Sequence, residues 1–332
     1  MEISTQILAL RSRGRGRWAC VWALTCALSM SACQSAPEPS LSLNRSVYLM
    51  GTSVEIQVNA DHRASAVQAS ELIVRALEST EARLSTWRAD SELSRFQRGE
   101  VKASPALRAE LDAALAWCRA TDGAFEPRCA AMVQAWGLRG EGRLPSSDEQ
   151  RSAALDHSRW EEGGFGKGAG LASVARGLAA LPDVKRAQIN LGGQWLLFGP
   201  GPFEIEVADP DARMTAVASL RISGGSVATS GNSERGVVID GRYFGHVLDP
   251  RSGAPAPDFG SVTVIHPDPL AADCLATAFL VLGPEAALAW AARDPQLEVL
   301  IVERGLDGPR LRGSAGLDFT PTQLASTSLS SR

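Results

Sequence analysis

The chain has 332 residues, of which 45% are hydrophobic and 21% charged, a composition with enough apolar material for a globular core. Its formal net charge of -4 argues against a general nucleic-acid-binding protein, which would need a basic surface. Beyond the N-terminus no apolar run reaches the roughly 20 residues that a membrane-spanning helix requires.

The N-terminal segment predicts a secretory signal rather than a folded element. Arginines at alternate positions from Arg11 to Arg17 precede a short apolar stretch at 18–30, and two small residues then precede Cys33. The string L-S-M-S-A-C resembles a bacterial lipobox, which implies cleavage before Cys33 and lipidation of that cysteine. We therefore expect a signal peptide at 1–32 and a lipid-anchored linker at 33–45.

This anchor would attach the protein to the periplasmic side of a bacterial membrane. Gln34 follows the cysteine in place of an Asp, which favours the outer over the inner membrane. A plain secreted protein, cleaved without lipidation, is the alternative.

Along the rest of the chain, strand and helix patterns are interleaved without a regular strand–helix–strand repeat. Strands are predicted at 47–58, 188–198, 203–207, 216–223, 237–239, 244–248, 262–266 and 297–302. Helices are predicted at 64–86, 107–119, 169–181 and 284–294. The first helix is expected to bury Val67, Val74, Leu77 and Leu84. We expect an α+β fold of mostly antiparallel sheets with packed helices over residues 46–320, followed by a disordered tail at 321–332.

Three cysteines remain after the signal and Cys33, namely Cys118, Cys129 and Cys274. They form no C-x-x-C spacing, so neither a zinc site nor a thioredoxin-like centre is indicated. In an oxidising compartment, an odd number leaves open whether Cys118 and Cys129 form a disulfide. Cys274 is expected to be a buried thiol.

The stretch A-A-D-C-L-A-T-A-F-L-V-L-G at 271–283 places Asp273 and Thr277 four positions apart in an apolar run. If the run is a helix, both lie on one face, one turn apart, and offer oxygen ligands of the kind that Mg²⁺ prefers. The alternative is structural. Asp273 would then sit in the first turn, stabilised by the helix dipole, and the Thr277 hydroxyl would bond back to the helix.

Other motifs are weak when taken singly. G-G-F-G-K-G at 163–168 precedes a helix and carries Lys167, which suits an anionic ligand, although it is not a Walker A loop and a flexible loop is the simpler interpretation. N-L-G-G at 190–193 indicates a strand that ends in a turn, and S-V-A-T-S-G-N at 226–232 a polar loop or a ligand contact. G-H-V-L-D-P-R-S-G at 245–253 places His246 in a strand before a turn.

In their order, these motifs resemble the ApbE family, the FAD:protein FMN transferases. The resemblance covers most of the chain and implies an ApbE-like, T-fold-like architecture. The matching pieces are M-G-T (50–52), L-S-T-W-R-A-D-S-E-L-S-R-F (84–96), D-G-A-F-E-P (122–127), G-G-F-G-K-G (163–168), N-L-G-G (190–193), A-T-S-G (228–231), G-H-V-L-D-P-R-S-G (245–253) and A-D-C-L-A-T (272–277).

The resemblance implies a Mg²⁺-dependent enzyme that cleaves the pyrophosphate of FAD, transfers FMN to a Thr or Ser hydroxyl of a partner protein, and releases AMP. It implies a metal held by Asp273, Thr277 and a backbone oxygen at Gly164, with His246 as the base for the acceptor hydroxyl. The acceptor would be a protein such as a subunit of a membrane redox complex. The implied FAD-binding residues are Met50, Trp87, Ala124, Phe125, Glu126, Glu161, Lys167 and Leu248.

Some positions depart from the family pattern. The family usually has Asp where Glu126 and Glu161 stand, Thr where Arg128 stands, and Asp where Ala172 stands. These changes spare the metal ligands and alter the surroundings expected for FAD. Two alternatives share the fold: an FAD pyrophosphatase that gives FMN and AMP, and a non-catalytic FAD-binding lipoprotein.

Overall fold

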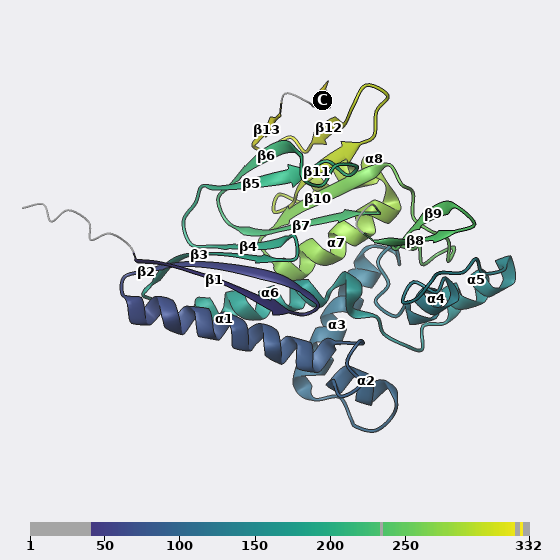
Figure 1. Ribbon diagram of the computed structural model, residues 1–332, viewed down its shortest axis with the longest axis horizontal. Coiled ribbons are helices and arrows are strands. Elements are labelled where there is room, and N and C mark those ends of the chain that lie inside the picture. The colour runs from purple at the N-terminus through teal and green to yellow at the C-terminus, as the bar shows by residue number, and fades with distance from the viewer. Residues whose placement is uncertain (1–40, 233–234, 323–325, 328–332) are drawn as a thin grey trace, which may run out of the picture. The chain divides into compact units, whose positions relative to one another are not determined.

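The computed structural model describes residues 41–232, 235–322 and 326–327 (Figure 1). The predicted signal peptide and the predicted lipidation site, Cys33, lie outside these residues. None of the helices in the described ranges is both long enough and apolar enough to cross a membrane. The first strand begins at Leu41, so ordered structure starts inside the segment predicted as a linker.

The strands form the mostly antiparallel sheets that the sequence predicts. A 9-stranded sheet has the order β1-β2-β3-β4-β7-β10-β11-β12-β14, in which every pairing but the last is antiparallel. Its strands are β1 Leu41–Leu49, β2 Thr52–Ala60, β3 Val184–Leu191, β4 Gln194–Phe198, β7 Gly225–Gly231, β10 Gly260–His266, β11 Glu298–Glu303, β12 Arg310–Gly313 and β14 Ser326–Thr327. Because β14 pairs with β12, part of the tail predicted to be disordered is a strand.

Two smaller sheets complete the β structure. One has the order β13-β6-β5, and the other is the β8–β9 hairpin. Their strands are β5 Phe203–Ala208, β6 Ala216–Ile222, β8 Gly236–Ile239, β9 Arg242–Gly245 and β13 Phe319–Pro321.

Two predicted strands are in fact hairpins. In the stretch 47–58, Leu49 pairs with Thr52 across Met50 and Gly51, whose φ angles of 52° and 71° are those of a two-residue primed turn. The stretch 188–198 turns in the same way at Gly192 and Gly193. The 226–232 segment, expected to be a loop or a ligand contact, contains most of the strand β7.

The helices at 64–86, 107–119, 169–181, 271–283 and 284–294 are all present, with shifted ends. The helical elements are α1 Arg63–Leu84, α2 Glu92–Gln97, α3 Pro105–Ala120, α4 Ala130–Ala135, α5 Ser147–Leu155, the 3₁₀ turn η1 Glu162–Gly164, α6 Gly166–Leu178, α7 Pro269–Leu282 and α8 Pro284–Ala291. On α1, Val67 is 42% exposed, contrary to expectation, because the buried stripe passes through Ala66 and Ser70 instead.

Helix α7 packs on one face of the large sheet. On that face, Val262 and Val264 of β10 pack against Leu275 and Phe279 of α7. On the opposite face, Ile265 packs with the small sheet β5–β6. Helices α1 and α6 cover the β2–β3–β4 part of the sheet (Figure 1). The apolar run therefore becomes a helix buried on nearly every side, and its polar residues are fixed in place.

The three cysteines of the domain are all free. Cys118 and Cys274 are buried and Cys129 is half-buried, so the disulfide left open by the sequence is not formed. Cys274 is thus the buried thiol that the sequence predicts, and burial raises its pKa well above the ordinary value.

Candidate functional site

The glycine-rich segment 163–168 is an ordered junction between two helices, not the flexible loop expected. It forms η1 and the first turn of α6. A Cβ at Gly168 would lie 2.6 Å from the Pro269 carbonyl oxygen and 2.8 Å from the Asp273 Cβ. The lack of a side chain therefore lets the first turn of α6 touch the start of α7. There the Gly168 N–H donates to the Asp273 carboxylate at 2.8 Å.

The predicted metal ligands meet at this junction. Asp273 is 6% exposed, and because α7 begins at Pro269 it lies beyond the first turn, so a helix-dipole role does not explain it. The Thr277 hydroxyl donates to the Asp273 carbonyl oxygen at 3.3 Å, which is the back-bonding that the structural alternative expected. A Cβ at Gly164 would lie 3.4 Å from the Thr277 Oγ1, so the side of Gly164 that lacks a side chain faces that hydroxyl.

The Asp273 carboxylate is a buried acid with little compensation. Burial raises the pKa of Asp273, against the opposing effects of the Lys167 charge and of the Gly168 N–H. An added cation beside such a group would favour its charged form. Within the described ranges, no cluster of three or more His, Cys, Asp or Glu side chains could hold a metal ion. The predicted set is of another kind, with the Asp273 carboxylate, the Thr277 hydroxyl and a backbone oxygen at Gly164, and hard oxygen donors of this sort suit Mg²⁺.

Two of the predicted FAD-binding residues flank the same junction. The Phe125 ring lies 3.1 Å from the position of a Cβ at Gly164, and the Met50 Sδ lies 3.2 Å from that of a Cβ at Gly170. Phe125 and its neighbour Ala124 are almost fully buried, so they form an apolar wall more than an exposed contact surface.

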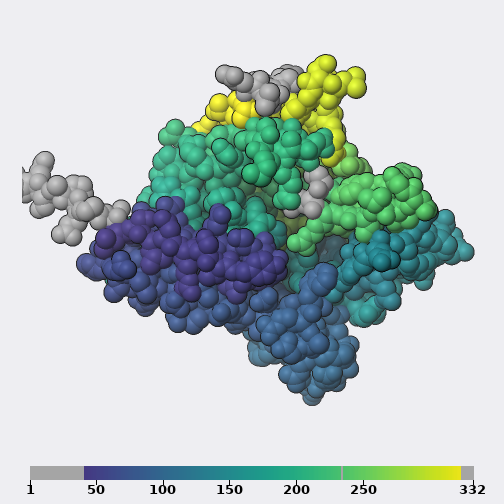
Figure 2. All heavy atoms as spheres, viewed as in Figure 1, coloured from purple at the N-terminus to yellow at the C-terminus, as the bar shows by residue number. Residues whose placement is uncertain are grey.

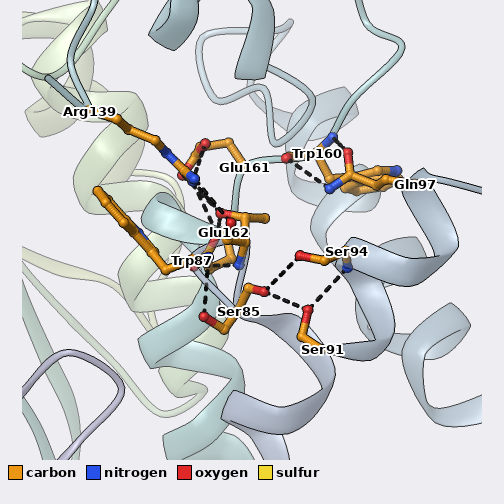
Figure 3. Close-up of polar contacts among 10 residues, drawn as sticks. Ser85, Trp87, Ser91, Ser94, Gln97, Arg139, Trp160, Glu161 and Glu162 are labelled. Carbon is orange, nitrogen blue, oxygen red and sulfur yellow. Dashed lines mark hydrogen bonds and ion pairs between the residues drawn. The ribbon is translucent and has the colours of Figure 1, made fainter. Parts of the chain in front are cut away.

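A second group of polar contacts lies directly before η1 (Figure 3). The Arg139 Nη2 donates to both Glu161 carboxylate oxygens, at 2.5 and 2.7 Å, and the guanidinium carbon lies 4.4 Å from the centre of the Trp87 ring. Burial raises the pKa of Glu161, with a further contribution from the neighbouring Glu162, and the Arg139 charge opposes both. Trp87 stays 67% exposed. These contacts join two predicted FAD-binding residues, Trp87 and Glu161, through an arginine that sequence reasoning missed.

A cleft of about 610 Å³ opens beside this group. Thr86, Arg139, Trp160 and Glu161 line it together with residues of α2 and α4. Its volume falls in the range of small-molecule sites.

The Glu126 carboxylate is hydrogen-bonded by residues close to it in the structure. Its buried carboxylate accepts hydrogen bonds from the Arg128 backbone N at 2.8 Å and from the Arg128 Nε and Nη2 at 2.9 Å, and from the Cys118 thiol at 3.2 Å. Burial alone would raise the pKa of Glu126, but these hydrogen bonds hold it below its ordinary value. The two departures, Glu126 and Arg128, thus compensate each other within the protein.

His246 and Leu248 lie on the segment after β9. Leu248 packs with Met132 and Trp136, in a different apolar cluster from that of Phe125. The His246 Nδ1 lies 2.9 Å from the Arg235 carbonyl oxygen. Val247, the next residue, packs against both apolar clusters that include residues of α7.

The fold and these contacts define an α+β protein with a buried carboxylate and a hydroxyl at a junction of two helices, and with an aromatic–carboxylate group beside it. The chain belongs to the ApbE family, whose model matches residues 50–301. The resemblance drawn from the motifs is thereby confirmed.

Relatives and solved structures agree with this assignment. The chain is 28% identical over 316 residues to the FAD:protein FMN transferase of Klebsiella pneumoniae (strain 342), covering 83% of this chain and 90% of that protein. It is 26% identical over 322 residues to that of Escherichia coli (strain K12), covering 85% and 92%. The ApbE protein of Thermotoga maritima superposes with a TM-score of 0.72 at 24% identity, covering 85% of this chain and 97% of that one. The flavin transferase ApbE of Vibrio cholerae superposes with a TM-score of 0.66 at 25% identity, covering 83% and 98%. The predicted fold is confirmed.

Proposed function

We propose that this protein is an FAD:protein FMN transferase that uses Mg²⁺ to transfer FMN to a Thr or Ser hydroxyl of an acceptor protein, with release of AMP. Membership of the ApbE family supports the transferase activity, since relatives along most of the chain are named for it. The observation that carries the metal part is the meeting of Gly164, Asp273 and Thr277 where α6 and α7 touch.

The residues that would hold Mg²⁺ are Asp273 through its carboxylate, Thr277 through its hydroxyl and Gly164 through its backbone oxygen. Bound there, Mg²⁺ would neutralise the charge of the FAD pyrophosphate and orient it for in-line displacement. Lys167, in the first turn of α6, supplies a positive charge close enough to lower the pKa of Asp273, and it would attract the same phosphates.

FAD would lie across the two groups of contacts. Met50 and Phe125 give the apolar wall at the junction, while Trp87 and Glu161 offer a ring to stack on and a carboxylate acceptor beside the 610 Å³ cleft. The roles of Ala124, Glu126 and Leu248 toward FAD stay predictions. Glu126 would act through Arg128, because Arg128 binds both of its oxygens.

His246 is the base in this proposal. The His246 Nδ1–H donates to the Arg235 carbonyl, so the lone pair of the neutral imidazole would be on Nε2. Nε2 takes the proton of the acceptor hydroxyl while that oxygen attacks the phosphorus of the FMN half. The bond from this phosphorus to the bridging oxygen breaks, and AMP leaves with that oxygen.

The proposal includes the localisation of the protein. We place it on the periplasmic side of a bacterial membrane, attached through lipid on Cys33, where a subunit of a membrane redox complex would be within reach. Membrane fractionation of the wild type and of Cys33→Ser tests this. The wild type should sediment with membranes and the variant should not; two soluble proteins would refute the anchor.

Transfer is tested by incubating the purified domain with FAD, Mg²⁺ and a candidate acceptor, with in-gel flavin fluorescence as the readout. Covalent fluorescence on the acceptor, together with acceptor-dependent AMP release, is the expected result. AMP release without an acceptor would indicate an FAD pyrophosphatase, and FAD binding without AMP release a flavin-binding lipoprotein.

A further inference from the structure

The residue that joins Trp87 to Glu161 stands on an ordered loop. The loop 137–143 connects α4 to the segment before α5, and the Arg143 N–H closes it by donating to the Trp136 carbonyl at 3.0 Å. The Trp136 indole N–H, at the start of the loop, donates to the Gly253 carbonyl at 2.7 Å. Arg139 therefore lies on a loop whose two ends are held by hydrogen bonds of Trp136.

Gly142 allows this loop to pack closely against the β8–β9 hairpin. Gly142 has a φ of 80°, and a Cβ there would lie 2.6 Å from the Val237 Cβ of β8. In Figure 2 the green hairpin lies against the teal segment that includes α4 and α5. The loop is thus tied down at its base and at Gly142, whereas Arg139, Gly140 and Glu141 at its tip are exposed.

From this base, Arg139 contacts three groups at once (Figure 3). Its guanidinium binds both oxygens of Glu161, donates to the Thr86 carbonyl at 3.1 Å and to the Thr86 hydroxyl, and covers part of the Trp87 ring at 4.4 Å. A planar guanidinium can do this because its fork of N–H donors and its flat face act in different directions. The exposed Trp87 indole is thus contacted by a side chain that is itself anchored by an ion pair with Glu161.

The charges around it give Arg139 a second effect. Glu161 and Glu162 are adjacent carboxylates, and both contact Thr86. A dinucleotide with a negative pyrophosphate would be repelled by two uncompensated carboxylates. Arg139 neutralises Glu161 through two hydrogen bonds and lies within 4.0 Å of Glu162.

We propose that Arg139 is a positioning residue for FAD. It fixes the Trp87 ring and the Glu161 carboxylate in one unit, and FAD stacks on the part of Trp87 that Arg139 leaves exposed. The 67% exposure of Trp87 with Arg139 in place leaves surface for a planar ligand. This inference rests on the proposed function, because it assumes that FAD is the substrate.

The opposite arrangement makes a different prediction. If Arg139 instead occupied the place of the flavin ring, FAD would have to displace it, and removing Arg139 would tighten binding. If Arg139 is a positioning residue, its removal frees the Trp87 ring and leaves the carboxylates of Glu161 and Glu162 facing the negative pyrophosphate of FAD. FAD binding should then weaken.

The test compares Arg139→Ala and Arg139→Lys with the control Arg151→Ala, which removes an arginine from an exposed ion pair with Asp148 on α5. FAD affinity is measured by quenching of flavin fluorescence, and KM and kcat by AMP release. We expect Arg139→Ala to raise Kd and KM about tenfold, which corresponds to about 1.4 kcal/mol, with kcat changed less than twofold. Arg139→Lys should recover part of the affinity, since it restores the charge but not the flat face. The control should match the wild type.

A double-mutant cycle with Trp87→Ala sharpens the result. If Arg139 acts by holding Trp87, its removal should cost clearly less in the Trp87→Ala background than in the wild type. If Arg139→Ala binds FAD as tightly as the wild type or more tightly, the inference is overturned. The proposed function still stands in that case, provided that the wild type binds FAD. A wild type that neither binds nor cleaves FAD refutes the proposed function itself. Should Arg139→Ala fail to fold, Arg139→Lys decides, and a wild-type Kd for it overturns the inference.

Discussion

The α6–α7 junction and the Trp87–Arg139–Glu161 group are built in different ways. The junction depends on the absence of side chains: Gly164 and Gly168 bring backbone close to Thr277 and Asp273, of which Gly168 and Asp273 are buried and Gly164 and Thr277 half-buried. The second group depends on long side chains that meet near the surface, where Trp87 is 67% exposed. The proposed metal half of the site is therefore set by packing, whereas the proposed FAD half is set by charge and by contacts of exposed side chains.

If that division is correct, the largest effect belongs to Asp273. Asp273→Ala should lower Mg²⁺-dependent AMP release by at least on the order of 100-fold, because a metal shared with phosphate oxygens cannot lose its one charged protein ligand without several kcal/mol of transition-state stabilisation. Thr277→Val should reduce the rate less. The rate is measured at saturating FAD beside a thermal melt of each variant. Rates near that of the wild type in both variants would refute this metal site.

The packing of the junction is tested by its glycines. Gly168→Ala places a Cβ 2.6 Å from the Pro269 carbonyl oxygen and should cost about 1–3 kcal/mol of unfolding free energy. Gly163→Ala is the matched control, since the nearest atom to its Cβ lies 4.0 Å away. Urea denaturation of the two variants measures the difference. Equal stabilities would mean that the helices can separate at no cost, contrary to the account of the junction.

The exposed group should respond in binding and not in stability. Trp87→Ala should weaken FAD binding by roughly 1–2 kcal/mol through the loss of stacking, with little change in Tm. Tyr48→Ala serves as the control, because Tyr48 is an aromatic residue that is 74% exposed on β1 and belongs to neither group. Fluorescence titration with FAD gives both dissociation constants, and an unaltered value for Trp87→Ala would remove this ring from the site.

A smaller effect is expected on stability, where the cost of burying the Asp273 charge should depend on pH. Because burial raises the pKa of Asp273, its charged form disfavours folding, and this cost appears as the pH rises through the range in which the carboxyl ionises. Asp273→Asn keeps the shape and lacks the charge, so in the presence of a chelator it should be more stable than the wild type at pH 7. The advantage should vanish at low pH and shrink when Mg²⁺ is added. Melting curves at both pH values check the sign, and a less stable Asn variant would contradict it.

The sequence predicted the junction better than the exposed group, for physical reasons. An apolar run with helical spacing was enough to place Asp273 and Thr277 on one face of α7, because burial on nearly every side requires such a run. The glycine segment was expected to be a loop, since glycine disfavours helices, whereas in the structure Gly168 lies in α6 so close to Pro269 that a side chain would not fit.

Other features could not be read from local pattern. The turn at Met50 and Gly51 was missed because apolar and polar residues alternate on both sides of it without a break. Arg139 was missed because its partners, Glu161 and Thr86, lie 22 and 53 positions away. The only local sign was the glycine spacing around it, at 137, 140 and 142.

The most direct test of the central claim is FMN transfer by the wild type and by Asp273→Asn, with FAD and one acceptor, in Mg²⁺ and in a chelator. The account predicts a fluorescent acceptor band and stoichiometric AMP only for the wild type with Mg²⁺, while both proteins remain folded. A band of equal strength from Asp273→Asn, or from the wild type in the chelator, would contradict it.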